Sequence, residues 1–323
     1  MMRAGRDCPL DYRLARDAFA GEPLLQCDTL YVVGGLYGNR QALAALQRRL
    51  AAEPGARVVF NGDAHWFDRD PLIFAAIEQG LGAHLALRGN VETELGRADD
   101  SGAGCGCAYP MSVDDAVVER SNAIQAALAG TVRGLPGVAE RLAARAATAL
   151  VSVGGQRVAV SHGDELSLAG WGCARESLAA PTRQRQLDEW LAANELRVLA
   201  TSHTCSAVAL NLSHGALINN GAAGLPNFAG GRYGLFSRIA TTPHAAALYR
   251  CQRDGLFIEA LPLNYDHAAF LADFDHQWPA TSPAALSYRA RVLGDCPDRA
   301  QHALLAGFSL CQSLCALEAL SDE

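Results

Sequence analysis

Short apolar runs alternate with amphipathic stretches over the first two thirds of the chain. Five of these runs end in polar residues, as buried parallel strands do, and they span residues 29–35, 57–63, 83–90, 157–164 and 197–204. Helical spacing of apolar positions predicts helices over residues 39–51, 70–79, 112–129, 135–147 and 182–193. Closely spaced strands follow at residues 207–212, 215–221, 235–240 and 246–250. This order predicts an α/β protein in which two sheets pack together with helices outside.

The chain divides into a main domain and two flanking segments. Residues 1–27 carry charges of both signs and lack the apolar core of a signal peptide. Residues 28–263 hold the alternating pattern, and residues 264–323 are expected to form a helical extension packed on the core. Its last segment is predicted to be a helix with an apolar stripe made of Leu304, Leu305, Phe308, Leu310, Cys311 and Leu314. This stripe must be covered, either by the edge of the active site or by a second subunit, so an oligomer could form through these helices.

Composition excludes several classes of protein. The chain has 323 residues, of which 50% are hydrophobic and 19% charged, with a net charge of −7. An acidic balance argues against non-specific nucleic-acid binding, which needs a basic face. No apolar run approaches the ~20 residues that a membrane helix requires. We therefore expect a cytoplasmic protein with no nucleic-acid or membrane partner, whose ten cysteines are mostly free.

Four polar side chains follow predicted strands at their carboxyl ends. They are Asp63, Asn90, His162 and His203. Each one alone is an ordinary turn or surface residue. Together, one carboxylate, one amide oxygen and two imidazoles form a mixed oxygen and nitrogen shell that suits Zn, Mn or Fe.

The order of these motifs resembles the calcineurin-like metallophosphoesterase superfamily. The resemblance covers about residues 28–250, and it includes the "INNGAAGLP" stretch at 218–226, which is similar to a segment that commonly follows the family's last motif. It implies a four-layer α-β-β-α sandwich and hydrolysis of phosphate esters.

The resemblance also implies two metal sites, of which one is degenerate. Gly35, Tyr37 and Cys205 stand where family members place three ligands of the first metal. The ligands of the second metal are all present, namely Asp63, Asn90, His162 and His203. We therefore expect one divalent transition metal (Zn, Mn or Fe) and a second metal that is weakly bound or absent.

Other positions near these motifs are candidates for catalysis and substrate binding. Val91 stands where many family members carry a His that can protonate the leaving group. His65 lies two residues beyond the metal-binding Asp and is a candidate proton donor. Arg88 is a candidate catalytic and phosphate-binding residue, because a guanidinium suits two phosphate oxygens. Asn39 and Tyr37 are candidate contacts to substrate oxygens.

Sulfur ligands offer an alternative for the degenerate site. Cys205 could bind a metal together with Cys105 or Cys107, since thiolates bind Zn and Fe well. The C-x-C spacing of the last two differs from the C-x₂-C of common zinc sites, and the alternative is that Cys205 is a packing residue.

The sequence thus favours an atypical, single-metal phosphoesterase-like hydrolase that uses a metal-activated water on a small phosphorylated or phosphate-like molecule. Two alternatives stay open. One is a noncatalytic descendant of the fold that binds a ligand or partner with its metal. The other is a metalloenzyme of another reaction class that reuses the site.

Overall fold

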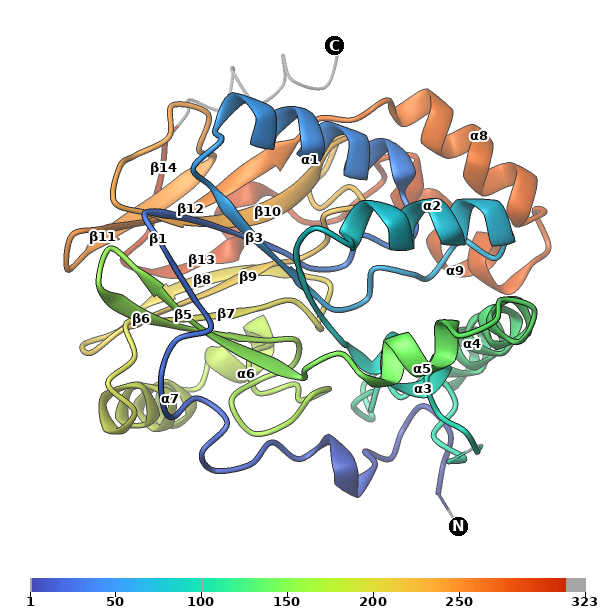
Figure 1. The fold of residues 1–323 in the computed structure, drawn as a ribbon, viewed down its shortest axis with the longest axis horizontal. Coiled ribbons are helices and arrows are strands. Elements are labelled where there is room, and N and C mark those ends of the chain that lie inside the picture. Colours follow the sequence, from blue (N-terminus) through green and yellow to red (C-terminus); the bar gives the residue numbers. More distant parts are fainter. Residues whose placement is uncertain (1, 100, 312–323) are drawn as a thin grey trace.

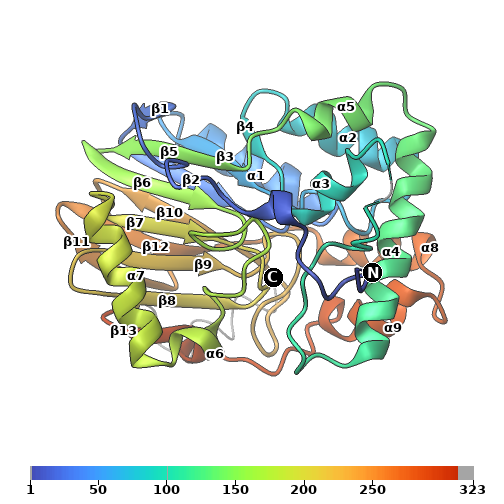
Figure 2. The ribbon, with the colours of Figure 1, turned by 90° about the horizontal axis from the view of Figure 1, so that it is seen from below.

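Two stacked sheets with helices on both outer faces make up the protein (Figure 1, Figure 2). The computed structural model describes residues 2–99 and 101–311. The four-layer α-β-β-α sandwich expected from the sequence is confirmed. In the described part of the chain, no helix combines the length and the apolar character that crossing a bilayer requires.

The first sheet is mixed and contains three of the strands predicted to carry or follow metal-site motifs. In spatial order its strands are β1 (Leu25–Cys27), β5 (Thr148–Val153), β6 (Gln156–Ser161), β7 (Val198–Thr201), β9 (Ala216–Asn220), β8 (Ala207–Asn211) and β13 (Leu304–Ala306). Strand β7 runs parallel to both of its neighbours, β6 and β9. The carboxyl ends of these three strands therefore lie at one edge of the sheet.

The second sheet contains the first three predicted strands, of which the last two lead to Asp63 and Asn90. Its order is β14 (Ser309–Leu310), β11 (Tyr249–Arg253), β12 (Leu256–Leu263), β10 (Gly234–Ala240), β2 (Thr29–Val33), β3 (Arg57–Asn61) and β4 (Leu85–Leu87). Strands β2, β3 and β4 are parallel, and β2 pairs antiparallel with β10. Alternation along β2 places Leu30 and Val32 between the sheets, while Tyr31 and Val33 face the helices.

Helices cover both outer faces, and their bounds lie within a few residues of most predictions. They are α1 (Arg40–Ala52), α2 (Pro71–Leu81), α3 (Asn90–Leu95), α4 (Asp115–Arg133), α5 (Val138–Ala143), α6 (Arg175–Leu178), α7 (Pro181–Ala193), α8 (His267–Gln277) and α9 (Pro283–Val292), with short 3₁₀ turns η1 (Leu10–Tyr12) and η2 (Ala300–Ala303). The helix predicted over residues 135–147 is shorter than expected, because it begins only after Gly137, which has a φ of 72°, and ends at Ala143. Side-chain caps fix several starts: Asn39 caps α1, Asp70 caps α2 and Asp114 caps α4.

The C-terminal extension is helical in α8 and α9, but the helix predicted over its last segment is wrong for residues 304–310. Strand β13 pairs with β8 in the first sheet, and β14 pairs with β11 in the second. Between them Gly307 adopts a φ of +70°, which interrupts any regular helix. Phe308 packs between the sheets, whereas Leu314 lies outside the described residues.

Candidate metal centre

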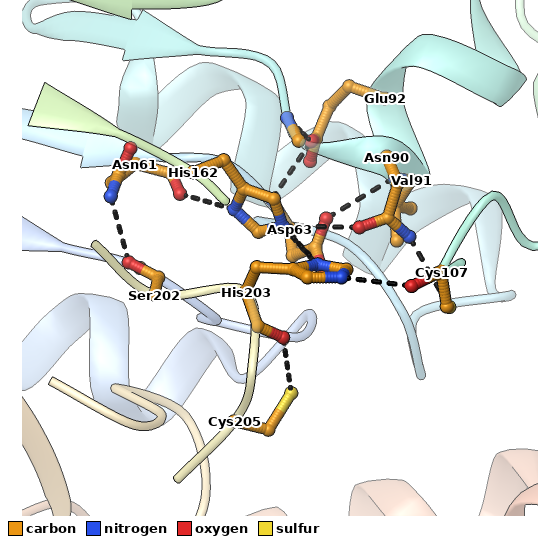
Figure 3. Close-up of polar contacts among 12 residues, drawn as sticks. Asn61, Asp63, Asn90, Val91, Glu92, Cys107, His162, Ser202, His203 and Cys205 are labelled. Carbon is orange, nitrogen blue, oxygen red and sulfur yellow. Dashed lines mark hydrogen bonds and ion pairs between the residues drawn. The ribbon is translucent and has the colours of Figure 1, made fainter. Parts of the chain in front are cut away.

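The four predicted ligands come together at the edge where parallel strands of both sheets end (Figure 3). Asp63 follows β3, and Asn90 begins α3 just after β4. His162 directly follows β6, and His203 lies two residues beyond β7. Because these strand ends face one another across the two sheets, their polar side chains share one buried space.

The ligand atoms converge on one point. One atom from each of Asp63, His162 and His203 lies within 4.8 Å of the others. The Nε2 atom of His162 is 3.3 Å from Asp63 Oδ2, 3.1 Å from Asn90 Oδ1 and 3.1 Å from His203 Nδ1. Two ligand atoms bound tetrahedrally at ~2.0–2.1 Å from a Zn ion are roughly 3.3 Å apart. The spacing therefore suits a single transition metal.

Outer hydrogen bonds fix which ring nitrogens face that point. His162 donates from Nδ1 to the carbonyl of Asn61 at 2.8 Å, and His203 donates from Nε2 to the carbonyl of Cys107 at 3.0 Å. A carbonyl can only accept, and a neutral imidazole has one N–H. When both rings are neutral, His162 Nε2 and His203 Nδ1 therefore present lone pairs to each other, and a shared cation removes this repulsion. The residues present fit a divalent metal, with the outer partners that metal-binding histidines typically have.

Asn90 and Asp63 are oriented by the backbone around them. The Asn90 amide donates to the carbonyl of Cys105 at 2.8 Å, which turns its oxygen toward His162. Buried Glu92, which the sequence analysis did not single out, accepts from the backbone amides of Asp63, Ala64 and Gly89 at 2.8–2.9 Å. This carboxylate holds the turn in which Asp63 adopts a φ of 52°. In the sequence, the only local signal for the role of Glu92 is that an acidic residue stands in the first helical turn after Asn90.

Electrostatics keep Asp63 and His203 in the states that metal ligands need. Burial alone would raise the pKa of Asp63, but the rings of His162 and His203 hold it below its usual value. Burial, and then the facing ring of His162, lower the pKa of His203 to about 4. Burial opposes a charge on His162 as well, yet the Asp63 carboxylate raises the pKa of that ring. At neutral pH, His203 is thus neutral and Asp63 is charged.

At the degenerate site, Tyr37 and Cys205 contact each other and leave no room for a side chain at Gly35. Cys205 donates from its thiol to the carbonyl of His203 at 3.3 Å, so the Tyr37 hydroxyl donates to the Cys205 sulfur at 2.6 Å. A side chain on Gly35 would place its Cβ 2.8–2.9 Å from the end of the Tyr37 ring. Burial raises the pKa of both the Tyr37 phenol and the Cys205 thiol, so neither offers a negative charge.

The sulfur alternative does not fit this geometry. Within residues 2–99 and 101–311, no cysteine sulfur joins a cluster of three close ligand groups. Cys105 and Cys107 contribute instead through their backbone carbonyls, which orient Asn90 and His203. Cys107 also lines the cavity described below.

His65 lies outside the cavity above the ligands, which does not fit the proton-donor role predicted for it. Its fully buried ring stacks on Phe74, with centroids 3.7 Å apart. Its Nδ1 is 2.6 Å from an Asp68 oxygen and its Nε2 is 2.9 Å from Glu78. Burial alone would lower the pKa of His65, but these two carboxylates raise it to about 9. Both nitrogens are therefore committed to a buried ion network.

Arg88 and Asn39 also take structural positions. The Arg88 guanidinium donates to the carbonyl of Arg145 at 2.7 Å and does not line the cavity. Asn39 accepts from the backbone amide of Ala42 at 2.9 Å and donates to the carbonyl of Gly224 at 2.9 Å. Both side chains are used by local backbone groups, and the roles predicted for them in substrate binding do not match these contacts.

A cavity of about 290 Å³ opens directly above the candidate ligands. Helices α4 and α9 pack against each other (Figure 2). Both helices contribute residues to the lining of the cavity. Its lining residues are Tyr37, Asp63, Trp66, Asn90, Val91, Cys107, Tyr109, Val117, Arg120, Trp171, His203, Thr204, Cys205, Leu286, Ser287 and Tyr288. Since α9 belongs to the C-terminal extension, that extension covers the edge of the site. A larger groove of about 810 Å³ between α2 and α5 contains none of the ligands.

Sequence reasoning missed the aromatic and basic side chains of this cavity. Trp66, Tyr109, Trp171 and Tyr288 come from four separate segments, and Arg120 lies in the middle of α4. None of them ends a strand, so they meet over the ligands only through tertiary packing, in which three loops carry Trp66, Tyr109 and Trp171 and helices α4 and α9 carry Arg120 and Tyr288.

Comparison with known proteins places this fold. No protein-family model matches the sequence, and no curated protein matches it either. The hypothetical protein PH1004 from Pyrococcus horikoshii OT3 is 14% identical, with a TM-score of 0.54 over 79% of this chain and 94% of that one. A metallophosphoesterase from Sphaerobacter thermophilus is also 14% identical, with a TM-score of 0.48 over 82% of this chain and 99% of that one. Yfce, a phosphoesterase from E. coli, is 14% identical, with a TM-score of 0.34 over 73% and 100% of the two chains.

The fold is that of the metallophosphoesterase-like proteins, and the resemblance predicted from the motifs is confirmed at this level. Asp63, His162 and His203, which the resemblance implies as ligands of the second metal, lie close together, whereas Gly35, Tyr37 and Cys205 stand where it implies ligands of the first.

Proposed function

We propose that the chain is a metal-dependent phosphoesterase-like hydrolase that holds one divalent transition metal and acts on a small phosphorylated molecule. The observation that carries this proposal is the pair of imidazole nitrogens, 3.1 Å apart, that lie beside Asp63 and Asn90 in a buried space. Side chains arranged in this way bind a cation, and the cavity above them has room for a small ligand.

A bound divalent ion would supply water with a pKa near 7 and would polarise a phosphoryl oxygen. The residues of the chain would hold the ion, orient its ligands and bind the anionic group. Asp63, Asn90, His162 and His203 hold the ion, and Asn61 and Cys107 fix the two rings through their carbonyls. Arg120 lines the cavity, where its guanidinium can bind an anionic group.

The test is to measure metal content and hydrolysis of p-nitrophenyl phosphate by the purified protein supplied with Zn, Mn or Fe. Substituting His162→Ala removes one ligand and should lower metal occupancy sharply and abolish turnover. The matched control is His214→Ala, which removes an exposed ring paired with Asp188 and should change neither. Metal binding that survives the loss of His162 would contradict the proposed ligand set.

A noncatalytic, ligand-binding descendant is the second candidate. It is favoured by the positions of His65 and Arg88, which leave the cavity without the predicted proton donor and phosphate contact. Tight, His162-dependent metal binding without hydrolysis of any phosphate ester would favour this second candidate.

A further inference from the structure

We propose that the cavity above the ligands selects phosphate esters of flat aromatic alcohols, with the aromatic group held among Trp66, Tyr109, Trp171 and Tyr288 and the anionic group held at Arg120. This inference rests on the proposed function, since it names the substrate class of that same site.

The shape and chemistry of the walls favour a flat ring. Tyr109 and Trp171 lie with ring centroids 5.8 Å apart, and Trp66 and Tyr288 meet edge to face at 6.5 Å. Tyr109, Trp171 and Tyr288 are half-buried, so they keep surface free for a ligand. Aromatic rings prefer offset or edge-to-face contacts with other rings, which these walls can offer from two sides. The cavity volume of about 290 Å³ limits the ligand to a small molecule.

The charges in the cavity favour an anion and disfavour a cation. Among the described residues, Asp63 is the one carboxylate in the lining, and it belongs to the metal centre. Arg120 donates from Nε to the Ser287 hydroxyl at 2.6 Å. In the described part of the chain no carboxylate forms an ion pair with this arginine. An aromatic cage can also hold a quaternary ammonium group, but a guanidinium beside the cage would repel one.

The cavity also lacks a group that could protonate a strongly basic leaving group. Val91 lines it beside Asn90 (Figure 3), and His65 is enclosed between Asp68 and Glu78 outside it. Burial raises the pKa of Tyr109 and Tyr288 well above the usual range, which makes both phenols poor proton donors at neutral pH. The described cavity residues therefore favour an ester whose alcohol leaves without help.

An aromatic alcohol meets this requirement. The oxygen of water attacks phosphorus and gives up a proton to solvent, and the bond from phosphorus to the aryl oxygen breaks. The bonding electron pair leaves on that oxygen as a phenolate, which later takes a proton from solvent. A phenol has a pKa near 10, whereas water, which an alkyl alcohol resembles, has 15.7. Loss of general acid catalysis, which contributes typically 10²–10⁴-fold, thus matters far less for the aryl ester.

The first test measures binding without chemistry. Phenylphosphonate and cyclohexylphosphonate have rings of similar size and cannot be hydrolysed as esters. Titration of the metal-loaded protein, followed by calorimetry, should show the phenyl compound binding several-fold to about tenfold more tightly. Equal affinities, or tighter binding of phosphocholine than of phenylphosphonate, would overturn the proposal whether or not the protein is a hydrolase.

Variants locate the two halves of the ligand. Trp171→Leu should remove most of the preference for the phenyl ring, and Trp190→Leu, on the outer face of α7 against Phe19, should leave it unchanged. Tyr288→Leu provides a second variant that contacts no candidate metal ligand, and metal content is measured for each. Arg120→Gln should weaken the binding of both phosphonates alike by roughly tenfold or more. Arg133 is exposed on the same helix, and Arg133→Gln should leave both affinities unchanged.

The second test measures turnover. Phenyl phosphate should be hydrolysed at least 10²-fold faster than cyclohexyl phosphate. Similar rates for the two esters would refute the leaving-group argument. If neither ester is hydrolysed but the phenyl preference in binding holds, the proposed hydrolase activity fails and the aromatic ligand class stands.

Discussion

At the scale of single residues, the degenerate metal site depends on the match between Gly35 and Tyr37. The Tyr37 ring occupies the space that a side chain at position 35 would enter, and its hydroxyl is hydrogen-bonded to the sulfur of Cys205. All three residues have a positive φ, of 65°, 56° and 55° in chain order. Asp and His are among the residues that tolerate this region best, so the backbone remains suited to the ligands that the family places here.

Restoring the three ligands tests this interpretation. Elemental analysis should find about one equivalent of tightly held metal in the wild type and a value approaching two in the Gly35→Asp, Tyr37→His, Cys205→His triple variant. The single variant Gly35→Asp serves as the control. Its new side chain collides with the Tyr37 ring, so it should lower the melting temperature without adding metal. Two tightly bound equivalents in the wild type would show that the site has been misread.

The residues that the sequence predicted correctly in position are those that end strands. Asp63, Asn90 and His162 can be recognised in the sequence because each follows an apolar run that stops at polar residues. The carboxyl ends of parallel strands meet in an α/β fold. Residues such as Arg120 and Trp171 carry no such local signal. His65 was misjudged because nearness in sequence to Asp63 does not fix the direction of its side chain, which turns toward Glu78.

At the scale of elements, the loop after α3 shows how backbone groups can tune a metal centre. The carbonyls of Cys105 and Cys107 orient Asn90 and His203, and Gly106 lies between them with a φ of +66°. A side chain at this glycine would overlap the buried hydroxyl of Tyr12. The loop can therefore keep its two carbonyls in place only with glycine at position 106.

Substituting Gly106→Ala should displace both carbonyls and weaken metal binding by about 10–100-fold, as loss of outer partners typically does. Gly102→Ala is the matched control, because Gly102 has a φ of +75° in the same loop but an added Cβ there meets no described atom within 4 Å. Competition with a chelator measures the metal affinity of both variants. If the two lose the same affinity, backbone strain rather than the carbonyl positions explains the loss.

A buried ion network joins α2 to the loop before it and makes a separate, pH-dependent contribution to stability. The network contains His65, Asp68, Glu78 and Arg145. Burial alone would raise the pKa of Glu78, but hydrogen bonding and charge from His65 and Arg145 lower it to about 2. A carboxylate whose pKa is lower in the folded state stabilises the fold at pH values above its unfolded-state pKa of 4.5. This contribution is lost as the pH falls from about 4.5 to 2. For this side chain, which is 11% exposed, the contribution is about 3 kcal/mol.

Urea unfolding measured at pH 7 and at pH 3 checks this expectation. The wild type should lose more free energy of unfolding between the two values than Glu78→Gln, which lacks the titrating group. Glu189→Gln changes an exposed residue of α7 and should behave as the wild type does. An equal acid sensitivity in Glu78→Gln would mean that other carboxylates account for the whole effect.

The element that the sequence mispredicted is short and lies at two sheet edges. Residues 304–310 have apolar positions that fit a helix or a strand, and periodicity cannot separate the two over so few residues. Strands β13 and β14 contain three and two residues and are stabilised by their partners β8 and β11. Their structure follows from contacts with distant parts of the chain, which no local pattern records.

At the scale of the whole molecule, the C-terminal extension connects both sheets and the candidate site. Helix α9 supplies Ser287 and Tyr288 to the cavity, and its Arg291 donates to the carbonyls of Pro226 and Cys205 at 2.7 and 3.0 Å. Farther along, Asp298 pairs with both terminal nitrogens of Arg175 at 2.8–2.9 Å. The extension thus covers the site edge within one chain. An oligomer formed through it stays a prediction.

Deleting residues 298–323 should expose two sheet edges at once, because β13 covers β8 and β14 covers β11. Unpaired edges favour association between chains, and the deletion also removes Phe308, which packs edge to face on Tyr249 between the sheets. Light scattering should therefore detect aggregation, with a clear loss of thermal stability. A chain that ends at residue 311 is the control, since the difference between the two truncations isolates residues 298–311, which contain both strands, η2 and Asp298. A 298–323 deletion that stays monomeric and melts as the control does would show that the two edge strands contribute little to the fold.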